Sequence, residues 1–311
     1  MTELPSIPTI REDQLPAAYR ASDRAAIDAQ RTYLILVRIN IVLILAGAAT
    51  TSWAIQVAPA RAALAVVGAI ALGLGSLLTL AIKVTNYDKV WFGARAIAES
   101  IKTLVWRYMT RAHPFDPILD ENQADELFCK EVAHILLERR TLGGFLARTE
   151  AADGQITDLM RKVRRESTAL RKSLYLRERI KNQHTWYANK GKANRVSATT
   201  WLIAIALCQA LAVVAAILLV RWPWFDLNFA SILSALAVAL LAWLQVKRHQ
   251  DLSHSYGLAA HELGLIEALE KHILSDEDLS KFVGDAENAI SREHTMWLAR
   301  RDTLYPLRTY E

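Results

Sequence analysis

The stretch INIVLILAGAATTSWAIQVA, residues 39–58, decides the fold of this chain because it runs for twenty residues without a charged side chain. Three more uncharged stretches follow at 62–82, 199–220 and 229–246. About 20 apolar residues allow a helix to cross the hydrocarbon core of a bilayer. We therefore predict an all-α integral membrane protein. Its four transmembrane helices form two hairpins, and the remaining helices form a cytoplasmic bundle.

The composition of the whole chain agrees with this division. Of its 311 residues, 52% are hydrophobic and 22% are charged, which excludes a disordered chain. The two cysteines exclude a disulfide-stapled secreted module, and since Cys208 lies within the third stretch we expect no disulfide with Cys129. More than thirty mostly polar residues precede the first stretch, so it is predicted to be an internal anchor and not a cleaved signal.

The distribution of Lys and Arg predicts the orientation. Residues 1–38 hold five, residues 83–198 hold twenty-two and residues 247–311 hold eight, whereas each short hairpin loop holds one. The positive-inside rule then places both termini and the central segment in the cytoplasm. The central segment also carries fourteen Asp and Glu. Since Lys and Arg outnumber these acidic residues, we expect attraction of the segment to anionic lipid. Its charges alternate in sign along the predicted helices and form no patch of one sign, so we expect no nucleic-acid partner.

Helical periodicity outside the apolar stretches predicts a repeated organisation. Helices are expected at residues 11–38, 87–111, 120–140, 174–195, 250–274 and 279–301, with Asp276 as the N-cap of the last. Each half then contains a leading helix, a hairpin of two spans and an amphipathic exit helix. We predict a first unit at 1–148, a linker at 149–170 and a second unit at 171–311.

The sequence contains no catalytic motif with the required spacing. His261-Glu262 begins like a zinc-binding helix, but Leu265 stands where the second histidine would be. The sequence has no glycine-rich phosphate loop before a Lys-Ser or Lys-Thr, and no charged cluster lies inside the spans. We expect no enzyme activity, no catalytic residue, no cofactor and no metal.

Small and polar residues form stripes on the predicted spans, because steps of seven and eleven residues return to nearly the same helix face. The members of these stripes, with Arg38 at the start of the first span, are Asn40, Gly47, Thr51, Gly68, Gly75, Thr79, Gln209, Ser234 and Gln245. One interpretation is close helix packing. The other is that these residues line an aqueous path in a ring of subunits, with Arg38 at its cytoplasmic mouth.

Aromatic and charged residues on the remaining helices are candidate anchors of the bundle. They are Trp91, Glu99, Trp186, Tyr187 and Trp297. Glu99 is expected to pair with Arg95 one helical turn before it. The helix at 87–111 has an alternative location flat on the membrane surface, and Trp186 has an alternative role in stacking on a ligand.

Four segments resemble a known bacterial membrane family: YRASDRAAIDAQRTYLILVR at 19–38, ARAIAESIKTLVWRYMTR at 94–111, YLRERIKNQHTWYANKGKAN at 175–194 and SREHTMWLARR at 291–301. The family is the SLATT superfamily, the two-span effector domains associated with SMODS and SLOG modules, of which many carry the label DUF4231. The resemblance covers nearly the whole chain as two tandem SLATT units.

This resemblance implies a membrane effector of a bacterial conflict system. Such a protein would act as an oligomeric pore or ion channel in the bacterial inner membrane, in antiviral defence by abortive infection, triggered by a separate partner that makes or senses a nucleotide. The implied partners are the lipid bilayer, further copies of the chain and that nucleotide-signalling protein. The alternative is a non-conducting membrane scaffold that recruits a cytosolic partner.

Overall fold

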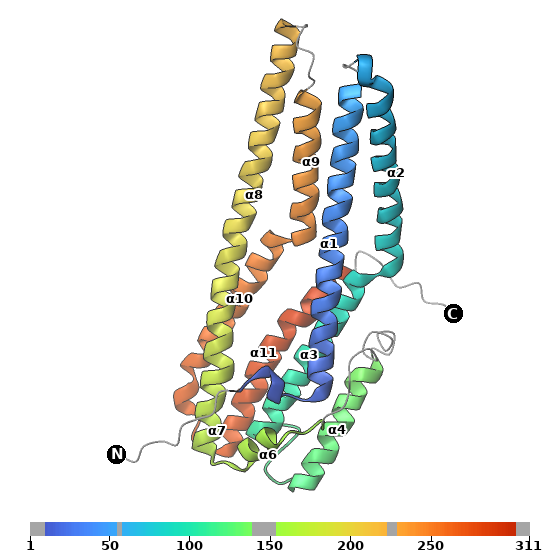
Figure 1. Cartoon of the computed structure of the whole chain (residues 1–311). Coiled ribbons are helices and arrows are strands. Elements are labelled where there is room, and N and C mark those ends of the chain that lie inside the picture. Colours follow the sequence, from blue (N-terminus) through green and yellow to red (C-terminus); the bar gives the residue numbers. More distant parts are fainter. Residues whose placement is uncertain (1–9, 55–57, 139–153, 223–228, 303–311) are drawn as a thin grey trace, which may run out of the picture. The chain divides into compact units, whose positions relative to one another are not determined.

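The computed structural model describes residues 10–54, 58–138, 154–222 and 229–302, with side chains up to Ser291 (Figure 1). Within these ranges the regular structure is helical and no strand occurs. The α-helices are α1 (Ala17–Ala54), α2 (Arg61–Thr85), α3 (Tyr87–Thr110), α4 (Glu121–Glu138), α6 (Asp158–Arg165), α7 (Thr168–Tyr175), α8 (Asn182–Arg221), α9 (Phe229–Lys247), α10 (His249–Ala268) and α11 (Asp276–Asp302). Short 3-10 turns occupy Glu12–Gln14, Ala58–Ala60 and Glu270–His272, and a π-helical segment, Leu176–Lys181, joins α7 to α8.

The helices form two compact units, and each unit draws on both halves of the sequence. Unit 1 contains the described residues of 1–29, 88–190 and 255–311, and unit 2 contains those of 30–87 and 191–254. Each compact unit therefore combines segments of both predicted sequence units, and the boundaries of those sequence units stay a prediction.

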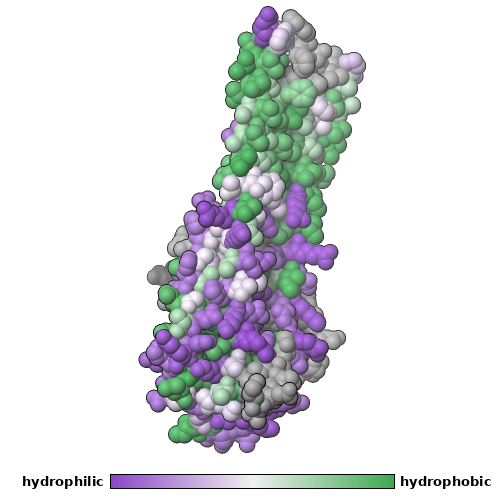
Figure 2. All heavy atoms as spheres, turned by 90° about the vertical axis from the view of Figure 1, so that its left-hand side faces the viewer, coloured by the Kyte–Doolittle hydropathy of each residue, from purple (hydrophilic) through white to green (hydrophobic). Residues whose placement is uncertain are grey.

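Unit 2 contains the four spans, as two helical hairpins (Figure 1). Each predicted apolar stretch corresponds to a helix that is long and apolar enough to cross a membrane, with the helix of the first stretch described as far as Ala54, so the expectation of four spans is confirmed. Large apolar side chains in these helices are exposed, among them Leu77 and Val220 at 66% and 82%. Figure 2 shows this apolar surface, which is the surface that a bilayer would cover.

The leading and exit helices of the two halves differ in continuity. α1 and α8 each run from unit 1 into a span without a break. By contrast, Asn86 separates α2 from α3 and Arg248 separates α9 from α10, each with a left-handed backbone (φ 50° and 48°). Few residues other than glycine adopt this conformation, since the side chain then crowds the backbone.

Unit 1 has a core of its own, built around α3. Fourteen residues of this helix are buried, and Ile97, Ile101, Val105 and Tyr108 are fully enclosed. The face predicted from periodicity is therefore packed against other helices of unit 1. α4, α6, α7, α10 and α11 add buried side chains that include Phe128, Met160, Tyr175, Leu263 and Val283.

Two features of unit 1 differ from expectation. The described part of the predicted linker folds as α6 and the start of α7, and Met160 within it is fully buried. The cap of α11 is Ser275, not Asp276: the Asp278 backbone N–H donates to Ser275 Oγ, and the Ser275 N–H donates to the Asp278 carboxylate. This reciprocal pair satisfies two backbone donors at the helix start, which leaves Asp276 free for a longer-range contact.

Candidate functional site

In the first hairpin, the polar and glycine stripes of α1 and α2 face each other. Asn40 Nδ2 donates to Thr79 Oγ1 at 3.0 Å, which joins the two helices by a side-chain hydrogen bond. A Cβ on Gly75 would lie 3.6 Å from Asn40 Oδ1 and 3.2 Å from Ile44. The two helices therefore meet through the residues that the sequence singled out.

The closest approach of this hairpin is at two buried glycines. A Cβ on Gly68 would lie 2.6 Å from Thr51 Cγ2 and 3.2 Å from the Gly47 carbonyl oxygen, and one on Gly47 would lie 2.6 Å from Leu72. Thr51 Oγ1 donates to the carbonyl oxygen of Gly47 at 2.7 Å, which fixes its side chain. These contacts are those of close helix packing. Whether the same stripe borders water in an assembly stays a prediction.

The candidate polar residues of the second hairpin are exposed, unlike the glycines that meet in the first. Gln209, Ser234 and Gln245 are all exposed, and none has a hydrogen-bond partner within the described part of the chain. Gln209 lies at the middle of the apolar stretch 199–220. An amide at this depth in a bilayer has no water to bond unless another chain or an aqueous path supplies a partner.

Arg38, expected at the mouth of a path, lies in unit 2 beside an aromatic ring. Its guanidinium carbon is 5.0 Å from the ring centroid of Trp243, and Lys247 Nζ is 5.8 Å from the same ring. Cation–π attraction favours this position of an arginine near a membrane interface. The contact joins α1 of the first hairpin to α9 of the second.

The candidate anchors on α3 lie in unit 1 as expected. Glu99 is buried and pairs with Arg95 at 2.8 Å, and Arg95 also bonds Asp23 of α1 at 2.7 Å. The predicted pair is confirmed, and it is extended by the carboxylate of Asp23. Trp91 packs on the small core residues Ala25, Ala26 and Ala94.

The sequence interpretation missed a fully buried ion pair between the π-helical segment and α11. Arg179 donates through Nε and Nη2 to both carboxylate oxygens of Glu287, at 2.9 and 2.8 Å. Tyr175 and Thr103 donate to the same carboxylate. Burial alone opposes the charge of Arg179, but Glu287 outweighs it and holds the pKa of Arg179 above its ordinary value. Burial and then Glu287 raise the pKa of Tyr175.

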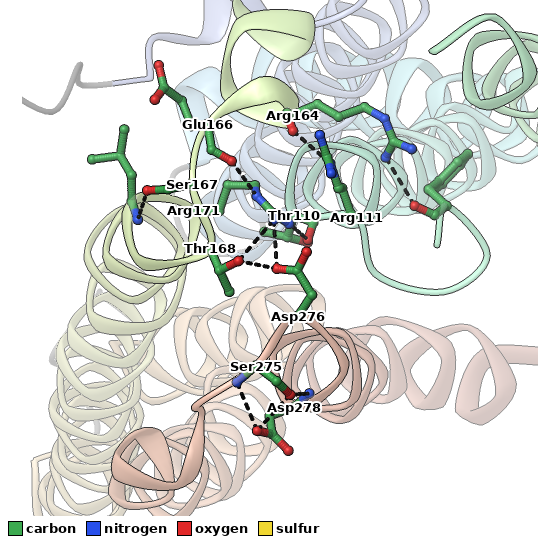
Figure 3. A network of polar contacts seen from close by, with 12 residues as sticks. Thr110, Arg111, Arg164, Glu166, Ser167, Thr168, Arg171, Ser275, Asp276 and Asp278 are labelled. Atoms are coloured by element: carbon green, nitrogen blue, oxygen red, sulfur yellow. Dashed lines mark hydrogen bonds and ion pairs between the residues drawn. The ribbon is translucent and has the colours of Figure 1, made fainter. Parts of the chain in front are cut away.

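A second polar network was also missed, where α3 ends (Figure 3). Arg171 is buried and donates to the Thr110 and Glu166 carbonyl oxygens and to the Asp276 carboxylate. Arg164, also buried, donates to the Tyr108 carbonyl oxygen at 3.0 Å. Burial lowers the pKa of both guanidinium groups, and repulsion from Arg111 adds to the effect on each. Positive charge at the C-terminal carbonyls of α3 stabilises that helix end, so this network has a structural role.

The aromatic pair on α8 is divided between core and surface. Tyr187 is buried, while 38% of Trp186 is exposed, and both rings contact Tyr256 of α10 at centroid distances of 5.6 and 5.3 Å. These contacts suit structural anchors. Trp297 lies in α11 beyond the described side chains, so its role as an anchor stays a prediction.

The interactions that the described side chains make are packing contacts, ion pairs and hydrogen bonds. Within these residues, no three His, Cys, Asp or Glu side chains lie close enough together to hold a metal ion. The features that stand out are therefore the exposed amides of the spans and the buried ion pairs of unit 1.

Two family models match the chain in tandem. Residues 16–172 match the SMODS and SLOG-associating 2TM effector domain 3 (SLATT_3), and residues 175–297 match the SMODS and SLOG-associating 2TM effector domain 1 (SLATT_1). No curated protein and no solved structure matches. Each matched region contains one of the two apolar hairpins. The chain is thus a multi-pass membrane protein that belongs to the SLATT superfamily, with two tandem two-span effector domains of the kind associated with conflict and antiphage systems.

Proposed function

We propose that several copies of this chain assemble into a pore in the bacterial inner membrane, as the effector of an antiphage system. A partner that makes or senses a nucleotide would trigger it, and unit 1 would lie in the cytoplasm, where that partner acts. The effector class of both matched domains supports the proposal. The observation that carries it is the unpartnered Gln209 in the third span.

The energetic argument concerns the amide of Gln209. Placing an amide in an apolar medium without a hydrogen-bond partner costs about 2 to 7 kcal/mol. Residues 199–208 and 210–220 contain no charged side chain that could draw water toward it. An assembly removes this cost in one of two ways: the amide bonds to another copy, or it borders a water-filled path.

In the first hairpin the amide of Asn40 has a hydrogen-bond partner, because it donates to Thr79. We therefore assign the lining of the path to the second hairpin, with Gln209, Ser234 and Gln245 as its polar residues. A path lined by amides and hydroxyls discriminates little between small ions. Arg38, near Trp243, would favour anions at the cytoplasmic mouth.

The test is conductance of purified protein in planar bilayers, measured at increasing protein-to-lipid ratios. We expect discrete openings, and we expect Gln209→Leu to reduce their frequency at least ten-fold. Leu207→Ala, also exposed in the same span but on a different face of α8, is the control and should conduct like the unchanged protein. Absence of conductance at every ratio would support the non-conducting scaffold instead.

Thiol labelling then locates the path. In a background with Cys129→Ser and Cys208→Ala, we compare Gln209→Cys with Leu207→Cys. Both positions are exposed, but two residues at about 100° each place them on different faces of α8. A water-soluble thiol reagent should modify position 209 during activity and leave position 207 unmodified. Equal protection of both thiols while current flows would exclude Gln209 from the path.

A further inference from the structure

α10 has two distinct faces, of which only one is used inside its own chain. Ala259, Ala260 and Leu263 are buried, and Tyr256 contacts the rings of Trp186 and Tyr187. On the same side of the helix, Glu267 lies 3.2 Å from His184 of α8. This face fixes α10 to unit 1.

The other face carries exposed leucines and is uncovered. Leu258, His261, Leu265 and Ala268, here called the α10 seam, follow one another at spacings of three, four and three residues, and all four are exposed. Leu258 is 54% exposed and Leu265 is 73% exposed, and Leu269 beside them is 54% exposed. Alternating spacings of three and four give a period of 3.5 residues, which is the period of a helix that packs along a second helix. The α10 seam therefore has the pattern of an interface without its partner.

We propose that the partner is the α10 seam of another copy of this chain, in a parallel arrangement. Copies inserted in one bilayer with the same topology are related by rotation about the membrane normal, so equivalent residues meet in the same layer. Leu258 would then face Leu258, and Leu265 would face Leu265. The four seam positions contain no Asp, Glu, Lys or Arg, so self-pairing brings no such like charges together.

The flanks of the seam suit close approach of two helices. Gly257 precedes the seam residue Leu258, and a Cβ on it would meet nothing within 4 Å, whereas a Cβ on Gly264 would lie 3.7 Å from His184 of the same chain. A glycine at position 257 lets a second helix backbone come near. The space beside Gly257 is therefore open to a partner and is not filled by the chain itself.

The size of the seam argues for a partner in the same membrane. α10 has 20 residues and is about 30 Å long, and its seam spans less than two heptads. A stable interface between soluble proteins buries about 1,200 to 2,000 Å², which a helix pair of this length does not reach alone. Chains held in one bilayer meet at a high effective concentration, which makes a weak contact sufficient. This inference rests on the proposed assembly, since the unpartnered Gln209 already calls for a second copy in unit 2.

The experiment is disulfide cross-linking of the full-length protein in membranes, in the background with Cys129→Ser and Cys208→Ala. Leu258→Cys and Leu265→Cys should each give covalent dimers on mild oxidation, in at least ten-fold greater yield than Lys281→Cys. Lys281 is an exposed position on α11 and serves as the control. Leu258→Glu combined with Leu265→Glu should abolish oligomers detected by native mass measurement, while Lys281→Glu should retain them.

The outcomes separate this inference from the proposed pore. Dimers at positions 258 and 265 without any conductance uphold the seam and overturn the pore. Conductance without such dimers upholds the pore and overturns the seam. Labelling of Leu258→Cys or Leu265→Cys by a lipid-phase probe, or cross-linking to a different protein or to residues of the same chain, would also overturn it, because the seam would then have another occupant.

Discussion

Gly68→Ala should destabilise the first hairpin, whereas Gly73→Ala on the same helix should not. Both changes add one methyl group to α2, and both replace a residue that weakens a helix. They differ only in what the methyl group meets. At Gly68 it would lie 2.6 Å from Thr51 Cγ2, 2.8 Å from Thr50 Oγ1 and 3.2 Å from the Gly47 carbonyl oxygen. At Gly73 it would meet nothing within 4 Å.

The magnitude follows from two opposing effects. Replacing glycine by alanine inside a helix stabilises it by about 0.5 to 1 kcal/mol. Overpacking costs about 1 to 3 kcal/mol. At Gly68 relief is restricted, because Thr50 and Thr51 are held by hydrogen bonds to the carbonyl oxygens of Ala46 and Gly47. We therefore expect Gly68→Ala to lose about 1 to 2 kcal/mol net. Gly73→Ala should be neutral or slightly stabilising.

The measurement is the midpoint of thermal unfolding in detergent, where each kcal/mol corresponds to about 2 to 4 °C in proteins of this size class. Gly75→Ala extends the series, since its methyl group would lie 3.2 Å from Ile44 and should cost less than that of Gly68. Equal midpoints for Gly68→Ala and Gly73→Ala would refute the packing argument. Unchanged stability of Gly68→Ala together with altered conductance would mean that this stripe faces water.

Two further changes test unit 1 by the same unfolding measurement. Glu287→Gln leaves the buried guanidinium of Arg179 without its counter-charge and should lower the free energy of unfolding by about 3 to 5 kcal/mol. Glu287→Leu combined with Arg179→Met should recover much of that loss. No recovery would show that the hydrogen bonds of Tyr175 and Thr103 matter more than the charge. Ser275→Ala removes the cap of α11 and should cost about 1 kcal/mol; equal stability of this variant and the unchanged protein would contradict the assignment of the cap.

The spans were predictable because the membrane sets a simple condition on sequence. A run such as 199–220 must be long and uncharged wherever its helix packs, and no tertiary contact alters that requirement. The amphipathic face of α3 was predictable for a similar reason, since Ile97, Ile101 and Val105 repeat at the helical period. The pair of Glu99 with Arg95 depends only on residues one turn apart.

The missed networks depend on contacts between distant segments. Arg179 and Glu287 are 108 residues apart, and Arg171 and Asp276 are 105 apart. A partial signal existed for Glu287, because it interrupts the otherwise apolar face of Val283, Ala286 and Ile290. A charge on such a face must find a buried partner, yet the sequence does not say which arginine supplies it. The cap of α11 was misplaced by one residue because Ser275 and Asp276 both have side chains suited to that role.

The two halves of the chain differ in their polar side chains without hydrogen-bond partners and in their exposed apolar residues. In the first hairpin, the side chains of Asn40 and Thr79 bond to each other and the glycines fit against the facing helix. In the second half, Gln209 and Gln245 have no partner among the described residues, and the α10 seam is uncovered. A polar group in an apolar span and exposed leucines on a helix outside the spans are both costly. In the assembly that we propose, further copies of the chain would remove both costs together, so the second SLATT domain would carry the assembly and the first would pack internally.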